Sequence, residues 1–340
     1  YALRLTPASQ FDGTRSGQVI DYQLTVENRG YNRDRFDLVP SGNAWASTVI
    51  DAGFAGPLPR SAPLNPGDRL TFGLRVSVPA AAANGSTDEV SLTASSAGDP
   101  TARATVQVKT VAVTEQILLV DQDNEGPDVR SFYLGAITRT GRTADVWDLA
   151  KNPSIPPRFA QAHGTLVWLT GNAGSPLAVH EADLARFLDG GGRLFLCGWD
   201  AFDGGAGNTD FVRRYLHVDW DNERDNDIPT TQVHAVTTNT VTAGMGSLPI
   251  DTTVLGGSQF SDELELLHPA RPAFVDDRGR PDALTVQDDR YRVVYLAFPF
   301  EGMGTAADRQ ELMRRVLDWL GGDIPWQAYL PLLAKESPGR

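Results

Sequence analysis

The chain has one cysteine, Cys197, and this residue ends a short apolar run at a point where a nucleophile could be presented. A thiol becomes a nucleophile when a base removes its proton, and a sharp, glycine-flanked turn after a strand exposes it to substrate. Here the residues two positions to either side are Phe195 and Trp199. No downstream histidine is followed two positions later by glutamate, so the sequence lacks a histidine and acid at that spacing to take the thiol proton. The sequence therefore favours a small buried side chain at position 197.

Carboxylates follow two apolar runs, 116–120 and 194–197, where strands are expected to end. In open α/β sheets, ligands bind at the carboxyl ends of the strands. The acids after the first run would either hold a cation or cap the helix that follows. The candidate ligand-binding residues at these two points are Asp121, Asp123, Trp199, Asp200 and Asp203.

A run of alternating carboxylates lies further along the chain, with Arg224 inside it. Oxygen ligands at this spacing in a loop are typical of calcium sites, although the glycine of an EF-hand loop is missing. Two interpretations stay open, a calcium site and a solvated acidic loop. The candidate ligands are Asp219, Asp221, Glu223, Asp225 and Asp227, and calcium is the one cofactor that the sequence suggests.

Other catalytic motifs are missing from the sequence. The five histidines show no metal-ligand spacing, the stretch 204–207 lacks the lysine of a phosphate loop, and no serine lies in a G-x-S-x-G elbow. Aromatic residues near strand ends, Trp147, Trp168 and Phe202, either line a groove or pack between helix and sheet. The sequence thus predicts no catalytic residue and no enzyme.

The elements that position these residues divide into two domains. Residues 1–113 alternate apolar and polar side chains, as in 19–28, and turn residues separate the runs. Several short alternating strands predict an antiparallel β-sandwich. From 114 to 322, apolar strands alternate with helical patterns, which predicts a mostly parallel, doubly wound sheet.

The strands expected in the second domain are 116–120, 144–148, 165–170, 194–197 and 292–298, with helices at 129–140, 177–188 and 306–320. A β-leaning insertion occupies about 219–290 and includes 252–255 as a β-leaning segment. An apolar, proline-containing tail follows at 323–340.

The first domain resembles bacterial immunoglobulin-like domains. The resemblance rests on the V-x-Y-x-L-x-V-x-N-x-G spacing within 17–30 and on the turn 64–68. Such domains are found beside catalytic modules in secreted hydrolases and in cell-surface proteins. The resemblance implies a spacer or adhesive module without chemistry of its own.

The second domain resembles a degenerate form of the class I glutamine amidotransferase α/β module, which recurs in secreted bacterial peptidases and other exported proteins. The residues that carry this resemblance are 118–123, 191–196, 215–217, 291–295 and 315–320. It implies a flavodoxin- or amidotransferase-like sheet in an accessory role. The tail resembles the "YLPL" ending common in exported proteins of Chloroflexi-type bacteria.

The net charge is −13, and the whole excess lies in the second domain and tail. Residues 1–113 carry ten basic and ten acidic side chains, whereas 114–340 carry twenty and thirty-three. A field of this sign repels nucleic acid and anionic lipid. No apolar run is long enough to span a bilayer, so membrane insertion is not expected. The chain begins at Tyr1, which suggests a mature or excised piece of a longer protein.

The leading functional hypothesis is a non-catalytic, secreted or cell-surface structural or interaction protein. One alternative is an accessory region of a larger secreted peptidase, and a less favoured one is a hydrolase that uses Cys197 or the pair Asp200 and Asp203. The tail suggests head-to-tail self-assembly or binding to other surface proteins, because an extended apolar segment can add to the edge of a sandwich in a neighbouring copy. A tail folded on its own domain, or left disordered, is the alternative. The assembly candidates are Trp326, Tyr329, Leu330, Leu332 and Leu333.

Overall fold

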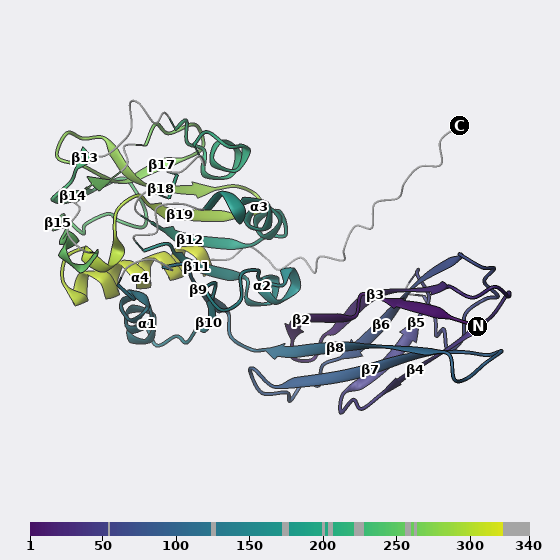
Figure 1. Ribbon diagram of the computed structural model, residues 1–340. Helices are drawn as coiled ribbons and strands as arrows, with labels where there is room; N and C mark the ends of the chain where they lie inside the picture. Colours follow the sequence, from purple (N-terminus) through teal and green to yellow (C-terminus); the bar gives the residue numbers. More distant parts are fainter. Residues whose placement is uncertain are drawn as a thin grey trace. The chain divides into compact units, whose positions relative to one another are not determined.

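The computed structural model describes residues 1–53, 55–123, 127–171, 177–198, 201–202, 207–220, 228–255, 260–261 and 264–321. The chain folds into two compact units (Figure 1). Unit 1 contains Tyr1–Gln116 and Ser154–His163, and unit 2 contains Ile117–Pro153 with the described residues from 164 onward. Unit 1 therefore includes a segment from beyond the boundary expected at 113. Among the described helices, none has both the length and the apolar character needed to cross a membrane.

Unit 1 is a sandwich of two four-stranded sheets, with strand orders β1-β3-β6-β5 and β2-β8-β7-β4. All neighbouring strands are antiparallel except β2 and β8, which run parallel. Only Pro7 and Ala8 separate β1 in one sheet from β2 in the other. The strands are β1 (Leu3–Thr6), β2 (Ser9–Arg15), β3 (Val19–Asn28), β4 (Phe36–Ser41), β5 (Ala46–Ile50), β6 (Arg69–Ser77), β7 (Thr87–Ser96) and β8 (Arg103–Val113).

The period-two pattern of β3 places its apolar side chains in the core of the sandwich, as the sequence predicts. Ile20, Tyr22, Leu24 and Val26 are buried, and they pack in one cluster with alternate residues of β6. Burying each such side chain contributes about 1.5–3 kcal/mol. A sandwich fold follows from this alternation.

Helix α2 (Pro157–His163) also belongs to unit 1, where it packs on β2. The Phe159 ring lies 6.4 Å, centroid to centroid, from that of Phe11. It occupies the space above Gly13, because a Cβ at that position would lie 2.8 Å from the Phe159 ring. Asp12 Oδ1 accepts a hydrogen bond from the Phe159 backbone N–H at 2.8 Å, which satisfies a donor in the first turn of the helix.

Unit 2 is built on a mixed nine-stranded sheet with the order β10-β9-β11-β12-β19-β18-β17-β14-β15. The first five strands run parallel, and the remaining four pair antiparallel. Such a mixed sheet is compatible with an α/β module. The strands are β9 (Ile117–Asp121), β10 (Asp145–Asp148), β11 (Thr165–Leu169), β12 (Arg193–Cys197), β14 (Gln232–Ala235), β15 (Ser247–Pro249), β17 (Arg271–Val275), β18 (Pro281–Gln287) and β19 (Arg292–Leu296).

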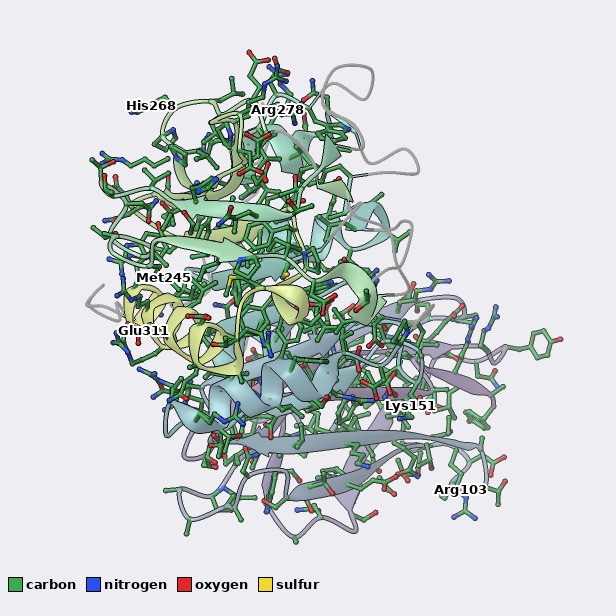
Figure 2. The ribbon with its side chains drawn as sticks, turned by 90° about the vertical axis from the view of Figure 1, so that its left-hand side faces the viewer. Arg103, Lys151, Met245, His268, Arg278 and Glu311 are labelled. Atoms are coloured by element: carbon green, nitrogen blue, oxygen red, sulfur yellow. The ribbon has the colours of Figure 1, made fainter. Side chains whose placement is uncertain are left out.

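Helices cover the parallel strands. On one face, α1 (Arg130–Arg139) and α4 (Ala306–Gly321) pack against a core that includes Val167 and Val294. Alternate residues point to the other face, where Trp168 contacts His180 and Tyr295 contacts Phe202. Helix α3 (Glu181–Asp189) begins directly after His180 and buries its apolar stripe. Several outward residues of α4 are charged, among them Glu311, which is labelled in Figure 2. Its carboxylate accepts hydrogen bonds from Arg314 and Arg315.

The insertion contributes β14, β15, β17 and β18 to the nine-stranded sheet. It also forms a separate two-stranded sheet from β13 (Ile228–Pro229) and β16 (Phe260–Ser261). The expectation of a β-leaning segment at 252–255 is wrong, because a 3-10 helix, Thr252–Leu255, forms there. Asp251 Oδ1 accepts hydrogen bonds from the Thr253 backbone N–H at 2.9 Å and from Thr253 Oγ1 at 2.6 Å. This local turn competes with strand pairing and starts the helical turn.

Candidate functional site

The candidate site lies at the edge of the sheet where the parallel strands of unit 2 end. Asp121 ends β9 and Asp148 ends β10, and the two residues are register partners. Asp121 is also in register with Leu169, the last residue of β11. The parallel register therefore brings side chains that are distant in sequence to one edge of the sheet.

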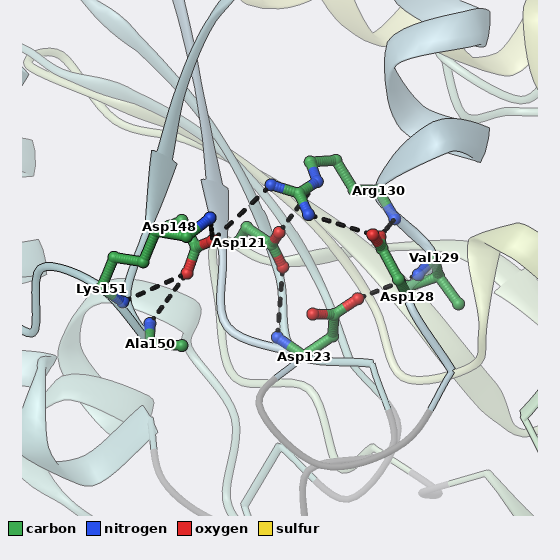
Figure 3. Close-up of polar contacts among 8 residues, drawn as sticks. All are labelled: Asp121, Asp123, Asp128, Val129, Arg130, Asp148, Ala150 and Lys151. Atoms are coloured by element: carbon green, nitrogen blue, oxygen red, sulfur yellow. Dashed lines mark hydrogen bonds and ion pairs between the residues drawn. The ribbon is translucent and has the colours of Figure 1, made fainter.

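One guanidinium connects the carboxylates at this edge. Arg130, the first residue of α1, places Nε 3.2 Å from Asp121 Oδ2, Nη2 3.0 Å from Asp128 Oδ2 and Nη1 3.7 Å from Asp148 Oδ2 (Figure 3). Lys151 Nζ adds a contact of 2.7 Å to Asp148. The network therefore contains its own cationic partners for these three acids.

Asp123 contacts the start of α1. Its Oδ2 accepts a hydrogen bond from the Val129 backbone N–H at 2.9 Å, and its own N–H donates to Asp121 Oδ1 at 3.3 Å. Gly171, at φ +58°, lies so close that a Cβ there would be 2.7 Å from the Asp123 Cβ. Of the two alternatives for these acids, the contact with the helix terminus is present in the structure. In this contact, one carboxylate oxygen of Asp123 accepts a hydrogen bond from a backbone N–H at the start of the helix.

The electrostatics of the edge depend on burial. Asp121 is 3% exposed, and burial, followed by the hydrogen bond and charge of Asp123, raises its pKa to about 7 against the opposing effect of Arg130. Carboxylate oxygens of Asp121, Asp123 and Asp128 lie within 4.8 Å of one another, a spacing that suits one cation. Arg130 competes with a cation for the same oxygens, and the cation assignment stays a prediction.

Most of the other predicted site residues lie outside the described residues. These are Trp199, Asp200 and Asp203 of the second strand end, Asp221, Glu223, Asp225 and Asp227 of the acidic run, and Trp326, Tyr329, Leu330, Leu332 and Leu333 of the tail. Asp219 is described: its Oδ1 accepts from Asn208 Nδ2 at 2.7 Å and pairs with Arg213. The calcium and assembly assignments therefore stay predictions.

The Cys197 thiol is buried in the hydrophobic core of unit 2. The residue is 1% exposed, and Sγ lies 3.4 Å from both the Phe298 carbonyl oxygen and the Phe300 backbone nitrogen, donating to the first and accepting from the second. Burial, reinforced by the charge of Glu301, raises the thiol pKa above its usual value. Because the thiolate is the reactive form, this environment opposes nucleophilic chemistry.

Sequence reasoning missed a buried acid beside this thiol. Glu301 is 2% exposed, and its Oε2 accepts a hydrogen bond from Tyr133 Oη at 2.9 Å. Burial raises its pKa to about 7, and the charge of Asp123 acts in the same direction. The sequence contains a pattern that points to this residue, because Glu301 is a single charged residue that directly follows the apolar run 293–300.

The aromatic residues near the strand ends mainly pack. Trp168 is 2% exposed, and its Nε1 donates to Gln122 Oε1 at 2.7 Å. Phe202 is buried against Tyr295 and Trp220. Trp147 is half-buried and donates to the Asn152 carbonyl at 2.9 Å. For Trp168 and Phe202 these contacts explain the residue types without a ligand groove.

A serine, a histidine and an aspartate form a hydrogen-bonded chain at the antiparallel end of the sheet, and the sequence motifs did not reveal it. His234 Nδ1 lies 2.7 Å from Ser247 Oγ, its cross-strand partner, and His234 Nε2 lies 2.7 Å from Asp277 Oδ1. The order matches that of a nucleophile, a base and an orienting acid. The Asp277 side chain is 59% exposed, so water competes for it.

Comparison with known proteins finds similarity to solved structures alone, at low sequence identity. No family model matches the chain, and no curated protein matches it. The solved structures similar to it include immunoglobulin-like and PapD-like β-sandwich domains.

Two of these are the ASH/PapD-like domain of human CEP192 (12% identity, TM-score 0.23, covering 33% of this chain and 84% of that one) and the E. coli chaperone DraB (11%, 0.23, 33% and 56%). A third similar structure is the exo-β-1,4-mannosidase Op5Man5 from Opitutaceae bacterium strain TAV5, at 13% identity and TM-score 0.41, covering 62% of this chain and 36% of that one. None of these similarities carries an argument about activity.

Proposed function

We propose that the protein is a non-catalytic structural or interaction component of an exported or cell-surface assembly. In this proposal, unit 1 is an immunoglobulin-like spacer or adhesive module and unit 2 is a degenerate amidotransferase-like module. The observation that carries the proposal is the environment of Cys197. Burial, hydrogen bonds to backbone on both sides and a raised pKa all disfavour the thiolate nucleophile that such a module would need.

The sheet of unit 2 supports the relationship with doubly wound folds. Numbered along the chain, its parallel strands β10, β9, β11, β12 and β19 stand in the order 2-1-3-4-5, which is the flavodoxin-like order. In that order the ligand site lies at the strand ends beside the point where the order reverses, between β9 and β11. Asp121 ends the first of these two strands, so a surviving role for this edge would be binding without chemistry.

The test combines thiol accessibility with activity assays. A thiol reagent such as iodoacetamide should leave Cys197 unmodified in the folded protein and modify it after denaturation. A panel of amide, ester and peptide substrates should show no turnover that depends on Cys197 or Ser247, and a fluorophosphonate probe should not label Ser247. Hydrolysis that disappears in Cys197→Ala or Ser247→Ala would overturn the non-catalytic proposal.

Self-assembly through the tail needs a separate test. Residues 1–340 would be compared with a chain that ends at Asp323, by light scattering and negative-stain electron microscopy. Polymers formed only by the full chain would support a connector role for the tail. If both chains remain monomeric, assembly through the tail is wrong, and an accessory role in a larger secreted peptidase becomes the better proposal.

A further inference from the structure

A groove of about 240 Å³ lies between α1 and α4 in unit 2. Three of the residues that line it, Gly135, Ala136 and Ala306, have no side chain beyond Cβ, which leaves space between the helices. Ser131 and Phe132 line it as well, and they offer a hydroxyl group and an aromatic ring. The space suits a ligand smaller than the drug-sized molecules that fill about 300–1,000 Å³.

Two arginines from different helices complete the lining, Arg139 from the last turn of α1 and Arg309 from the first turns of α4. Arg309 is held in place, because Nη1 donates to the carbonyl oxygens of Met303 at 2.8 Å and Gly304 at 3.1 Å. Its Cζ lies 5.2 Å from the Phe132 ring centroid. The Arg139 backbone carbonyl accepts a hydrogen bond from Gln310 Nε2 at 3.2 Å, which connects the two helices at this point.

Within the described part of the chain, no carboxylate directly contacts the guanidinium groups of the two arginines that line the groove. Neither arginine forms an ion pair with a carboxylate of the described residues. Burial lowers the pKa of Arg309, and the positive charge of Arg139 acts in the same direction against Asp308 and Glu301. The Asp308 carboxylate is already hydrogen-bonded to Thr305, and that of Glu301 to Tyr133. Two like charges therefore lie near one another, although acids outnumber bases in this part of the chain.

We propose that this groove binds a small organic anion whose carboxylate or phosphate groups contact Arg139 and Arg309 together. Planar guanidinium groups match the geometry of both oxyanions, and an anion would relieve the repulsion between the arginines. Phe132 and the alanine Cβ atoms would contact the carbon skeleton. This site needs neither Cys197 nor the tail, so it goes beyond the structural role proposed above.

Isothermal titration calorimetry of the full chain at low ionic strength tests the proposal, with citrate and inorganic phosphate as probes. Saturable binding of either probe is expected, and the tighter probe identifies the carboxylate or the phosphate as the preferred chemistry. Arg139→Gln should weaken binding at least about tenfold. The matched control is Arg186→Gln, because Arg186 is an exposed arginine of α3 that pairs with Asp183.

A second variant fills the groove without touching either arginine. A Cβ at Gly135 would meet no atom within 4 Å, so Gly135→Leu should fold and should abolish binding by occupying the space. Far-UV circular dichroism and the urea midpoint establish that each variant is folded. The proposal is overturned if neither probe binds saturably, or if Arg139→Gln or Gly135→Leu, folded, binds as tightly as the natural chain.

Discussion

At the scale of single residues, burial gives two acids, Glu301 and Asp121, an inverted contribution to stability, one that falls as the pH rises. The pKa of Glu301 rises from 4.5 to about 7 on folding, and that of Asp121 from 3.8 to about 7. At these two groups, the folded state therefore binds more protons than the unfolded state when the pH lies between the unfolded and the folded pKa. The contribution of each group is complete below its unfolded pKa and is lost as the pH rises through about 7.

Replacing Glu301 with glutamine should remove this loss. The amide oxygen can still accept the hydrogen bond from Tyr133, and no buried charge forms at alkaline pH. Glu301→Gln should raise the free energy of unfolding by about 3 kcal/mol near pH 8 and leave it nearly unchanged near pH 4. Thermal denaturation across this pH range measures the difference.

Glu311→Gln is a control of opposite sign. Hydrogen bonds from Arg314 and Arg315 lower the pKa of this outward-facing acid to about 2, so its contribution is present above its unfolded pKa of 4.5 and is lost as the pH falls through about 2. Its replacement should lower the melting temperature at neutral pH. An identical profile for the two variants would contradict the assignment of the inverted dependence to Glu301.

Arg130 should decide how the carboxylate edge responds to divalent cations. Its guanidinium occupies oxygens of Asp121 and Asp128 that a cation would need. In Arg130→Gln, calcium should therefore raise the melting temperature by several degrees more than in the natural chain. Equal calcium responses in a thermal-shift titration would show that the guanidinium and the cation do not compete.

Part of this edge was predictable because strand ends follow simple rules. Asp121 and Asp123 were identified from an apolar run that ends in acids, and a parallel sheet places such residues at one edge. Arg130, Asp148 and Glu301 were not identified, because their approach depends on the register of β10 and on the path of the chain after β19. Nothing in a local pattern specifies which distant side chains meet.

At the scale of elements, the segments with strong periodicity were predicted well. The strands at 117–121 and 193–197 and the helix at 306–321 lie within one or two residues of their expected bounds. Helix α2 was not predicted, because it is short and begins at the end of the proline-rich stretch 153–157. Its start is explained by Pro157 in the first helical position and by Asp12, a remote residue that no local pattern links to it.

Asp12 should stabilise α2 from the neighbouring strand. Asp12→Ala removes the acceptor for the Phe159 backbone N–H and leaves that donor unpaired, which should cost about 1 kcal/mol. Asp12→Asn keeps an acceptor oxygen and should cost less. Urea unfolding of the full chain measures both variants, and equal effects would argue against a capping role.

At Gly135 in α1, a substitution should increase the stability of the protein. The residue lies in the interior of the helix, and an added Cβ meets no atom within 4 Å. Gly135→Ala should therefore stabilise unit 2 by about 0.5–1 kcal/mol, because alanine loses less conformational freedom than glycine in a helix. The urea midpoint measures the gain, and a loss of stability would mean that the helix tolerates no side chain there.

At the scale of the whole molecule, the sandwich and the mixed sheet have separate hydrophobic cores. The sandwich also depends on α2, which covers Phe11 and Gly13. A chain of residues 1–116 should therefore unfold at a lower temperature than the sandwich in the full protein, by an amount that reflects about 2 kcal/mol of lost apolar burial. Calorimetry compares the two chains. The same melting temperature in both would show that α2 contributes nothing to the sandwich.

The chain passes from one unit to the other three times, at 116–117, 153–154 and 163–164. A single genetic breakpoint at the end of β8 would therefore give a sandwich without its helix and an α/β unit with a helix that has lost its partner. Recombination at that single breakpoint would therefore be penalised here. The two units should consequently be inherited together, and any shorter relative should lack α2 along with the sandwich or keep both.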